Sequence, residues 1–263
     1  MASALSTSTP VSPFGARLRQ WREIRGLSQL GLASQAGSTP RHISFLETGR
    51  SRPGRALLLR LADVLQLPLR DRNLLLQAAG LAPEYPEAGL DATELRPFRR
   101  ILDQLLTAHE PYPGLVLDAH ANVVAANRAA AALFGGGLAG VNLIERYLTD
   151  ASTRDAIVNW PEVAWAALAR LRKQLHRSPL DDDLRALVVL AETAVADLPP
   201  PREPQQHSLV ACPWFRIGDT VIRTIVVAAH FDTAMDVTLD ELRIELVYPQ
   251  DATAERYFRE HAQ

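Results

Sequence analysis

Polar and basic side chains that can recognise a polyanion are concentrated between residues 39 and 55. Arg41, His42 and Ser44 carry hydrogen-bonding groups, and the fork of an arginine matches the O6 and N7 acceptors of guanine. The aromatic edge of Phe45 can meet a thymine methyl group. Three arginines follow, where contacts to the phosphate backbone are expected. The predicted DNA-binding residues are Gln29, Thr39, Arg41, His42, Ser44, Phe45, Arg50, Arg52 and Arg55.

Two short helices joined by a tight turn are needed to present these side chains together. Ser28 is a good N-cap for the first helix, and Gly37 supplies the positive φ of the turn. Thr39 caps the second helix, and Pro40 takes its first position, where the missing N–H costs nothing. Gly49 ends this helix. The spacing predicts a helix-turn-helix, which places its second helix in the major groove of DNA.

Apolar residues around this motif predict three further helices between residues 13 and 80. Phe14, Leu18 and Trp21 recur at i, i+4 and i+7, and Gly26 follows them as a C-cap. Leucine repeats place a fourth helix from Gly54 to Leu65 and a fifth that ends at Gly80. Residues 13–80 are therefore predicted to form an all-α five-helix DNA-binding domain. A five-helix packing module that binds no DNA is the alternative.

Charge is distributed unequally along the chain. Residues 1–80 contain 11 Arg and 4 Asp or Glu, an excess of seven positive charges. Residues 81–263 contain 17 Arg or Lys and 26 Asp or Glu, a deficit of nine. A basic first third suits an N-terminal module that binds a polyanion, although a charge run can also be a solvated face.

Signals for catalysis, metal binding and cofactors are weak. Cys212 is the single cysteine, which excludes an internal disulfide and a multi-cysteine zinc site. Gly135–Gly140 matches G-x-G-x-x-G by letter, but it ends a helix instead of opening one. The aspartates at 181–183 face different ways on a helix, and no histidine lies at a matching offset. We expect no catalytic residues, no metal, no cofactor and no enzyme activity.

Targeting signals and a membrane span are also missing from the sequence. Residues 1–13 lack a signal-peptide pattern, and glycines and polar residues interrupt the most apolar stretch, 123–144. We therefore expect a cytoplasmic protein with no membrane contact. Residues 1–12 are predicted to be a disordered tail.

A composition change marks a domain boundary after the five helices. Residues 81–94 carry two prolines, a glycine and a net negative charge, and are predicted to be a linker. Residues 95–109 repeat apolar side chains at helical spacing. This helix can cap the second domain, pair with a partner chain or pack within its own domain.

The second domain, residues 95–263, is predicted to be α+β with an antiparallel sheet. Strands are expected at 114–117 and 123–126, followed by a helix that Asn127 caps. Two helices are predicted next, over 162–176 and from 181 to about 196. A hairpin is expected from 208–217 and 220–231. The last strand alternates apolar and polar residues from Leu242 to Tyr248, which predicts one buried and one wet face, with all helices on one side of the sheet.

The first eighty residues resemble the XRE, phage-repressor-type, helix-turn-helix family. The likeness covers residues 14–79 and is carried by Ser28-Gln29, Gly37 and the Glu47-Thr48-Gly49-Arg50 ending of the third helix. It implies that Gln29 lies near a phosphate and can brace the recognition helix. It also implies that the first exposed turns of that helix read base edges.

The remainder is similar to the MmyB-like ligand-binding domain found behind such motifs. The segments NVVAANRAA, NWPEVAWAALARLR and DVTLDELRIELVYP carry the likeness. It implies a PAS-like sensor with an apolar cavity and a fatty acyl ligand.

Apolar residues of the second domain supply candidate walls for such a pocket, although each can equally be plain core. Asn127, Arg223 and His230 are candidate anchors for a carboxylate, although His230 can simply bond a backbone carbonyl. The predicted ligand-binding residues are Leu117, Val124, Asn127, Phe134, Trp165, Leu168, Phe215, Arg223, His230 and Phe231.

These observations together favour a transcriptional regulator. The first domain would bind a palindromic operator on double-stranded DNA as a homodimer, and the second would sense an apolar small molecule such as a fatty acid. One alternative is that the second domain is a protein-interaction module without a ligand. An enzyme domain is the other alternative, and it would need a titratable pair that the sequence does not display.

Overall fold

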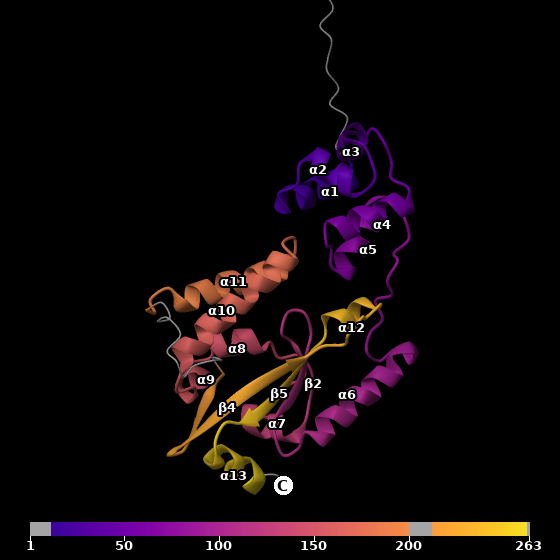
Figure 1. Ribbon diagram of the computed structural model, residues 1–263. Coiled ribbons are helices and arrows are strands. Elements are labelled where there is room, and N and C mark those ends of the chain that lie inside the picture. The colour runs from indigo at the N-terminus through magenta and orange to yellow at the C-terminus, as the bar shows by residue number, and fades with distance from the viewer. Residues whose placement is uncertain (1–11, 200–211, 262–263) are drawn as a thin grey trace, which may run out of the picture. The chain divides into compact units, whose positions relative to one another are not determined.

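A computed structural model describes residues 12–199 and 212–261 (Figure 1). The chain divides into two compact units, residues 1–86 and 87–263. The predicted disordered tail, apart from Ser12, lies outside the described residues. So do residues 208–211 of the predicted hairpin.

Five helices make up the first unit: α1 (Pro13–Ile24), α2 (Gln29–Gln35), α3 (Pro40–Glu47), α4 (Arg55–Val64) and α5 (Leu69–Ala78). The predicted caps are confirmed. The Ser28 hydroxyl accepts from the Gly31 amide at 3.0 Å, and that of Thr39 accepts from the His42 amide at 3.2 Å. Gly37, with φ of 63°, makes the turn between α2 and α3. This is the helix-turn-helix that the sequence predicts.

Backbone contact fixes α3 against α1. Gly15 lies in α1, and a Cβ atom built there would lie 2.5 Å from the carbonyl oxygen of Glu47 and 2.7 Å from that of Leu46. Only glycine permits this approach, because any side chain would push the two helices apart. The fully buried Leu18, Trp21 and Ile43 lie in the same core. The end of α3 is therefore held directly by the first helix.

The segment after α5 belongs to the first unit as far as Pro86. Asn73 of α5 is buried, and its side chain bonds the backbone of this segment: Oδ1 accepts from the amides of Glu84 and Tyr85, and Nδ2 donates to the Tyr85 carbonyl. Residues 81–86 of the predicted linker, 81–94, therefore pack on the first unit.

The second unit is built on a five-stranded antiparallel sheet with strand order β2-β1-β5-β4-β3. The strands are β1 (Gly114–Leu117), β2 (Val123–Ala126), β3 (Trp214–Ile217), β4 (Thr220–Ala229) and β5 (Arg243–Pro249). The first and last strands in sequence lie side by side at the centre, with Val116 opposite Ile244. The predicted α+β class is confirmed.

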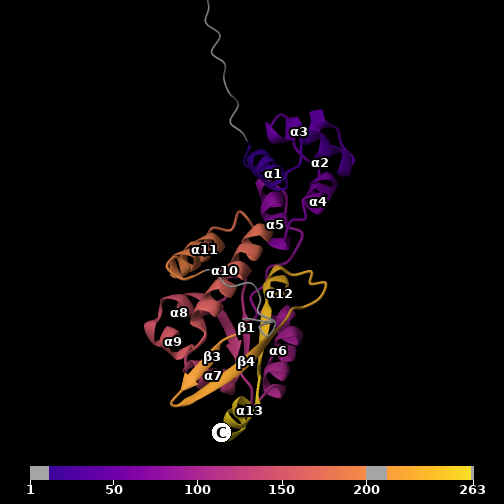
Figure 2. The same cartoon turned by 60° about the vertical axis from the view of Figure 1, so that its left-hand side comes forward.

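Helices cover both faces of this sheet (Figures 1 and 2). They are η1 (Thr93–Leu95), α6 (Arg96–Ala108), α7 (Arg128–Phe134), α8 (Leu143–Thr149), α9 (Ala151–Ala156), α10 (Trp160–Arg177), α11 (Asp182–Val195), α12 (Val237–Glu241) and α13 (Ala252–Glu260). Leu102 and Leu106 of α6 pack with Val116 and Ile244 on one face. Leu115 and Leu117 join a larger core with α7, α8, α10 and α11 on the other.

The prediction of helices on a single face is therefore wrong, and so is the wet face of the last strand. Glu245 points away from α6, yet its side chain is only 12% exposed. The reasons are that α6 covers the face on which Ile244 lies, and that the inserted helices cover the opposite face, where Arg170 of α10 lies next to Glu245. Within the described residues, no helix is long and apolar enough to cross a bilayer.

Candidate DNA-binding and ligand-binding sites

The outward face of α3 carries the predicted base-reading residues. Arg41 is exposed, and His42, Ser44 and Phe45 are half-buried. The Ser38 hydroxyl lies 3.2 Å from His42 Nδ1, which orients the imidazole. The Thr39 hydroxyl is occupied by the cap, so its structural part is to start the helix.

Arginines flank the Phe45 ring. The Arg41 guanidinium carbon lies 5.2 Å from the ring centroid, and that of Arg50 lies 6.0 Å away, both within cation–π range. Arg52 is exposed in the loop that follows. Within the described part of the chain, none of these three arginines forms an ion pair, so their charges are available to a polyanion.

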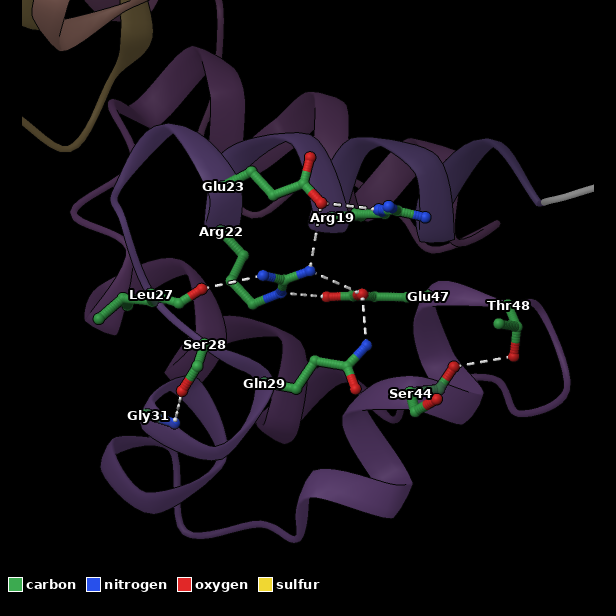
Figure 3. A network of polar contacts seen from close by, with 10 residues as sticks. All are labelled: Arg19, Arg22, Glu23, Leu27, Ser28, Gln29, Gly31, Ser44, Glu47 and Thr48. Carbon is green, nitrogen blue, oxygen red and sulfur yellow. Dashed lines mark hydrogen bonds and ion pairs between the residues drawn. The ribbon is translucent and has the colours of Figure 1, made fainter.

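A buried polar network fixes the other end of α3 (Figure 3). Arg22 of α1 donates to Glu47 through Nε at 2.5 Å and through Nη2 at 3.0 Å. Gln29 Nε2 donates to the same carboxylate at 2.8 Å. The Glu47 side chain is 3% exposed, and its hydrogen bond raises the pKa of Arg22. One carboxylate therefore ties α1, α2 and α3 together. Sequence reasoning missed Arg22 and Glu47 because their pairing spans 25 residues.

Arg55 differs from the other predicted phosphate-binding residues. Its guanidinium donates to the Ala82 carbonyl at 2.8 Å and to Glu84 Oε2 through Nε at 3.0 Å. The Arg55 side chain, which the sequence predicts to contact a DNA phosphate, is instead held by the segment after α5.

The structure brings about half of the predicted ligand-binding residues together. Leu117, Phe134, Leu168 and Phe215 are buried in one apolar cluster on the α10 face of the sheet, with the rings of Phe134 and Phe215 5.6 Å apart. Trp165 lies at the edge of this cluster and donates to the Pro199 carbonyl. These five remain the candidate apolar wall.

The remaining five predicted residues lie elsewhere. Val124 is 37% exposed, and the His230 ring bonds the Leu242 carbonyl. Phe231 packs against Phe98 in the cluster on the α6 face. Arg223 is 49% exposed and pairs with Asp251.

Asn127 has no capacity left for a ligand. Its Oδ1 accepts from the amides of Gly114 and Ala130, and its Nδ2 donates to the carbonyls of Leu106 and Tyr112. These bonds join β1, α6 and α7, so the residue is structural. Asn127 makes these bonds because it lies at the start of α7, next to the first residue of β1.

A charged group that the sequence did not reveal lies on the α10 face. Arg170 Nη1 of α10 is 3.6 Å from Glu245 Oε1, and Arg243 Nε is 2.8 Å from the same oxygen. Within the described residues, Arg243 Nε and Glu245 Oε1 are buried without a hydrogen bond of good geometry. Burial lowers the pKa of Arg170 and raises that of Tyr147, whose hydroxyl Glu245 also influences. Two arginines thus share one carboxylate, which leaves a surplus positive charge on side chains that are 36% exposed for Arg170 and 22% exposed for Arg243.

No histidine lies at a matching offset along the sequence, but one from a distant turn meets the aspartates at 181–183. The turn between β1 and β2 brings His120 Nε2 to 2.9 Å from Asp181 Oδ2. Ligand atoms of His120, Asp181 and Asp183 lie within 4.8 Å of one another. The hydrogen bond to Asp181 raises the pKa of His120, and Asp181 also caps α11. An ion pair and a helix cap account for this group.

The helix-turn-helix unit, the separate α+β unit and two family matches define the class: a transcriptional regulator with a helix-turn-helix DNA-binding domain and a separate ligand-binding domain. Residues 13–75 match the helix-turn-helix domain family. Residues 98–260 match the MmyB-like transcription regulator ligand binding domain. That match covers more than half of the chain, so this protein belongs to the MmyB-like transcription regulators.

Two similar proteins are regulators by their names. The uncharacterized HTH-type transcriptional regulator RghRB of Bacillus subtilis (strain 168) is 38% identical over 85 residues, which are 32% of this chain and 59% of that protein. The chain thus spans less than two thirds of that relative. The crystal structure of the clp gene regulator ClgR from Corynebacterium glutamicum shows 26% identity and a TM-score of 0.24, covering 38% of this chain and 93% of that one.

Proposed function

We propose that this protein binds a palindromic operator as a homodimer and responds to an apolar carboxylate such as a fatty acid. One α3 from each protomer would enter the major groove, about one helical turn apart. The second unit would act as a sensor without catalysis, in the cytoplasm. The outcome for transcription would follow from unequal affinity of the ligand for two arrangements of the dimer.

One observation supports the proposal that α3 binds DNA: its outer face carries exposed basic residues, and its end is held rigidly by the rest of the unit. Arg41 and Arg50 flank Phe45 on the outside of α3, while Glu47 at the end of the helix is bonded to α1 and α2. A base-reading helix must be held rigidly, because a bidentate contact to guanine tolerates little misplacement.

The ligand part is supported by the two clusters on the α10 face. An apolar wall around Phe134 and Leu168 suits an acyl chain. The surplus positive charge around Arg170 and Arg243 suits the head group, because an arginine pairs with a carboxylate in a bidentate geometry. A charge that is partly removed from water without a full partner costs free energy, so an anionic ligand would offset part of that cost.

DNA binding is tested with the full chain on duplexes over a range of salt concentrations. Arg52→Ala should weaken binding to all sequences equally and reduce the slope of log K against log salt by about 0.9, the loss of one phosphate contact. A loss confined to one sequence would assign Arg52 to base reading instead. Failure of the folded wild-type chain to bind any duplex at low salt would refute the proposal.

The ligand is tested by native mass spectrometry of gently purified protein. We expect an added mass that solvent extraction identifies as a fatty acid. A co-purifying protein with no small molecule would favour an interaction module, and turnover of an extracted compound would favour an enzyme. Either result would contradict the sensor proposal.

A further inference from the structure

Arg55 is the first residue of α4, next to the loop that carries Arg50 and Arg52. Gly54 provides no side-chain cap for this helix, so the N-terminus of α4 and the Arg55 side chain together suit a phosphate. The guanidinium is nevertheless engaged: it bonds the carbonyls of Ala82 and Pro83 and the carboxylate of Glu84. All these residues belong to the first unit.

The segment 82–85 is held in place on α5 by a second set of contacts. The Asn73 side chain makes three hydrogen bonds to this backbone at 2.7 to 3.1 Å: Oδ1 accepts from the Glu84 and Tyr85 amides, and Nδ2 donates to the Tyr85 carbonyl. The Arg72 guanidinium bonds the Tyr85 hydroxyl at 3.3 Å and lies over the tyrosine ring. Glu84 is therefore presented to Arg55 by a docked segment and is not a chance surface neighbour.

The ion pair itself is weak enough to be exchanged. The side chains of Arg55 and Glu84 are 41% and 37% exposed, and pairs of that exposure contribute roughly 0–1 kcal/mol. A DNA phosphate offers the same guanidinium an oxyanion of comparable geometry. Glu84 and a phosphate thus compete for one arginine.

We propose that segment 82–85 is an autoinhibitory clamp that withholds Arg55 from the DNA backbone. Docked, the clamp leaves Arg41, Arg50 and Arg52 as the available contacts; released, it adds one phosphate contact through Arg55. The chain enters the second unit at Glu87, directly after the clamp, so a ligand-dependent change there can act on Glu84 through the backbone. This inference rests on the proposed binding of DNA.

The test measures binding of the full chain to a random-sequence duplex across salt concentrations. Glu84→Gln should bind up to about fivefold more tightly at low salt, the factor that an exposed ion pair contributes. Its slope of log K against log salt should be steeper by about 0.9 because one more phosphate is contacted. The matched control is Glu23→Gln, which removes one negative charge from the exposed pair with Arg19 in the same unit and should leave the slope unchanged.

A double-variant cycle separates the clamp from a general charge effect. Adding Arg55→Gln should abolish the gain of Glu84→Gln, so that the double variant binds like Arg55→Gln alone. Equal gains for Glu84→Gln and Glu23→Gln, or a gain that persists without Arg55, would overturn the clamp while leaving DNA binding intact. A wild-type chain that ignores DNA would instead refute the proposed function.

Discussion

Each unit of this protein contains a cluster of charged side chains, and the two clusters differ in how completely their polar atoms are hydrogen-bonded. In the first unit, one arginine faces one glutamate, and Glu47 accepts three hydrogen bonds from Arg22 and Gln29. In the second, Arg170 and Arg243 share Glu245, and two of the buried atoms lack a well-formed hydrogen bond within the described residues.

We call the fully bonded group around Glu47 the closed network and the incompletely bonded group around Glu245 the open network. The two have different uses. The charges of Arg22 and Glu47 balance, and the Glu47 carboxylate is occupied by three hydrogen bonds that hold helices together. The group around Glu245 retains a positive charge and unsatisfied atoms at the edge of an apolar core. Protein interiors rarely leave buried polar atoms unpaired, so the open network is the better candidate for a binding site.

The largest expected effect comes from opening the closed network. Glu47→Ala leaves Arg22 buried without its partner and should lower the free energy of unfolding of the first unit by about 3–5 kcal/mol. Hydrogen exchange of the α1 and α3 amides measures it. The double change Arg22→Met with Glu47→Leu removes both charges and should recover most of the loss. A loss below about 1 kcal/mol for Glu47→Ala would show that the network does not support α3.

The open network should respond in the opposite way. Arg170→Met leaves Arg243 and Glu245 as a neutral pair, so stability should change little, while affinity for a fatty acid should fall by about 1.5–3 kcal/mol, the contribution of a hydrogen bond to a charged group. Calorimetric titration with the fatty acid measures this. Arg172→Met on the same helix removes an exposed arginine paired with Glu192 and serves as the control. Equal affinities for the two variants would reject Arg170 as the anchor.

Arg41→Ala tests the surface that the closed network supports. It should cost about 1–3 kcal/mol on the operator and relax the base preference at one position. Competition binding with single-base variants of the operator measures both. Arg19→Ala removes an exposed α1 arginine that pairs with Glu23 and should leave base preference unchanged. Unchanged discrimination in Arg41→Ala would assign that arginine to the backbone.

The smallest expected effect is a pH dependence of the second unit. Asp181 raises the pKa of His120, so the pair stabilises the fold fully below the unfolded value of about 6.5. That contribution is lost as the pH rises through the folded pKa. Thermal melts between pH 6 and pH 8 should show this loss in the wild type and a smaller one in His120→Gln. Identical pH profiles would mean that the pair adds nothing.

Local signals in the sequence predicted the first unit well. Caps such as Ser28 and Thr39 and the positive-φ glycines act within a few residues, so they fix helix ends without knowledge of the tertiary structure. The strands at 114–117 and 123–126 and the cap at Asn127 were predicted for the same reason.

Features that depend on distant pairing could not be predicted. No periodic signal in the sequence reveals that α6 covers the sheet or that Arg170 meets Glu245. The same is true of the contact between Arg55 and Glu84, which are 29 residues apart. Charged residues in the last strand were read as solvent-facing, because alternation alone does not reveal a helix on that side. Asn127 is a candidate carboxylate anchor from its side-chain type alone, since the sequence does not reveal the four hydrogen bonds to three separate elements that occupy it.

The most direct test of the account is the sequence preference of the full chain for DNA. Duplexes enriched from a random library should share a palindrome, and the wild type should bind them at least about 10³-fold more tightly than scrambled duplexes at physiological salt. Arg41→Ala should lose part of that ratio at one position of each half-site. A folded wild-type chain that enriches no sequence, or that binds all duplexes alike, would contradict the claim that α3 reads DNA.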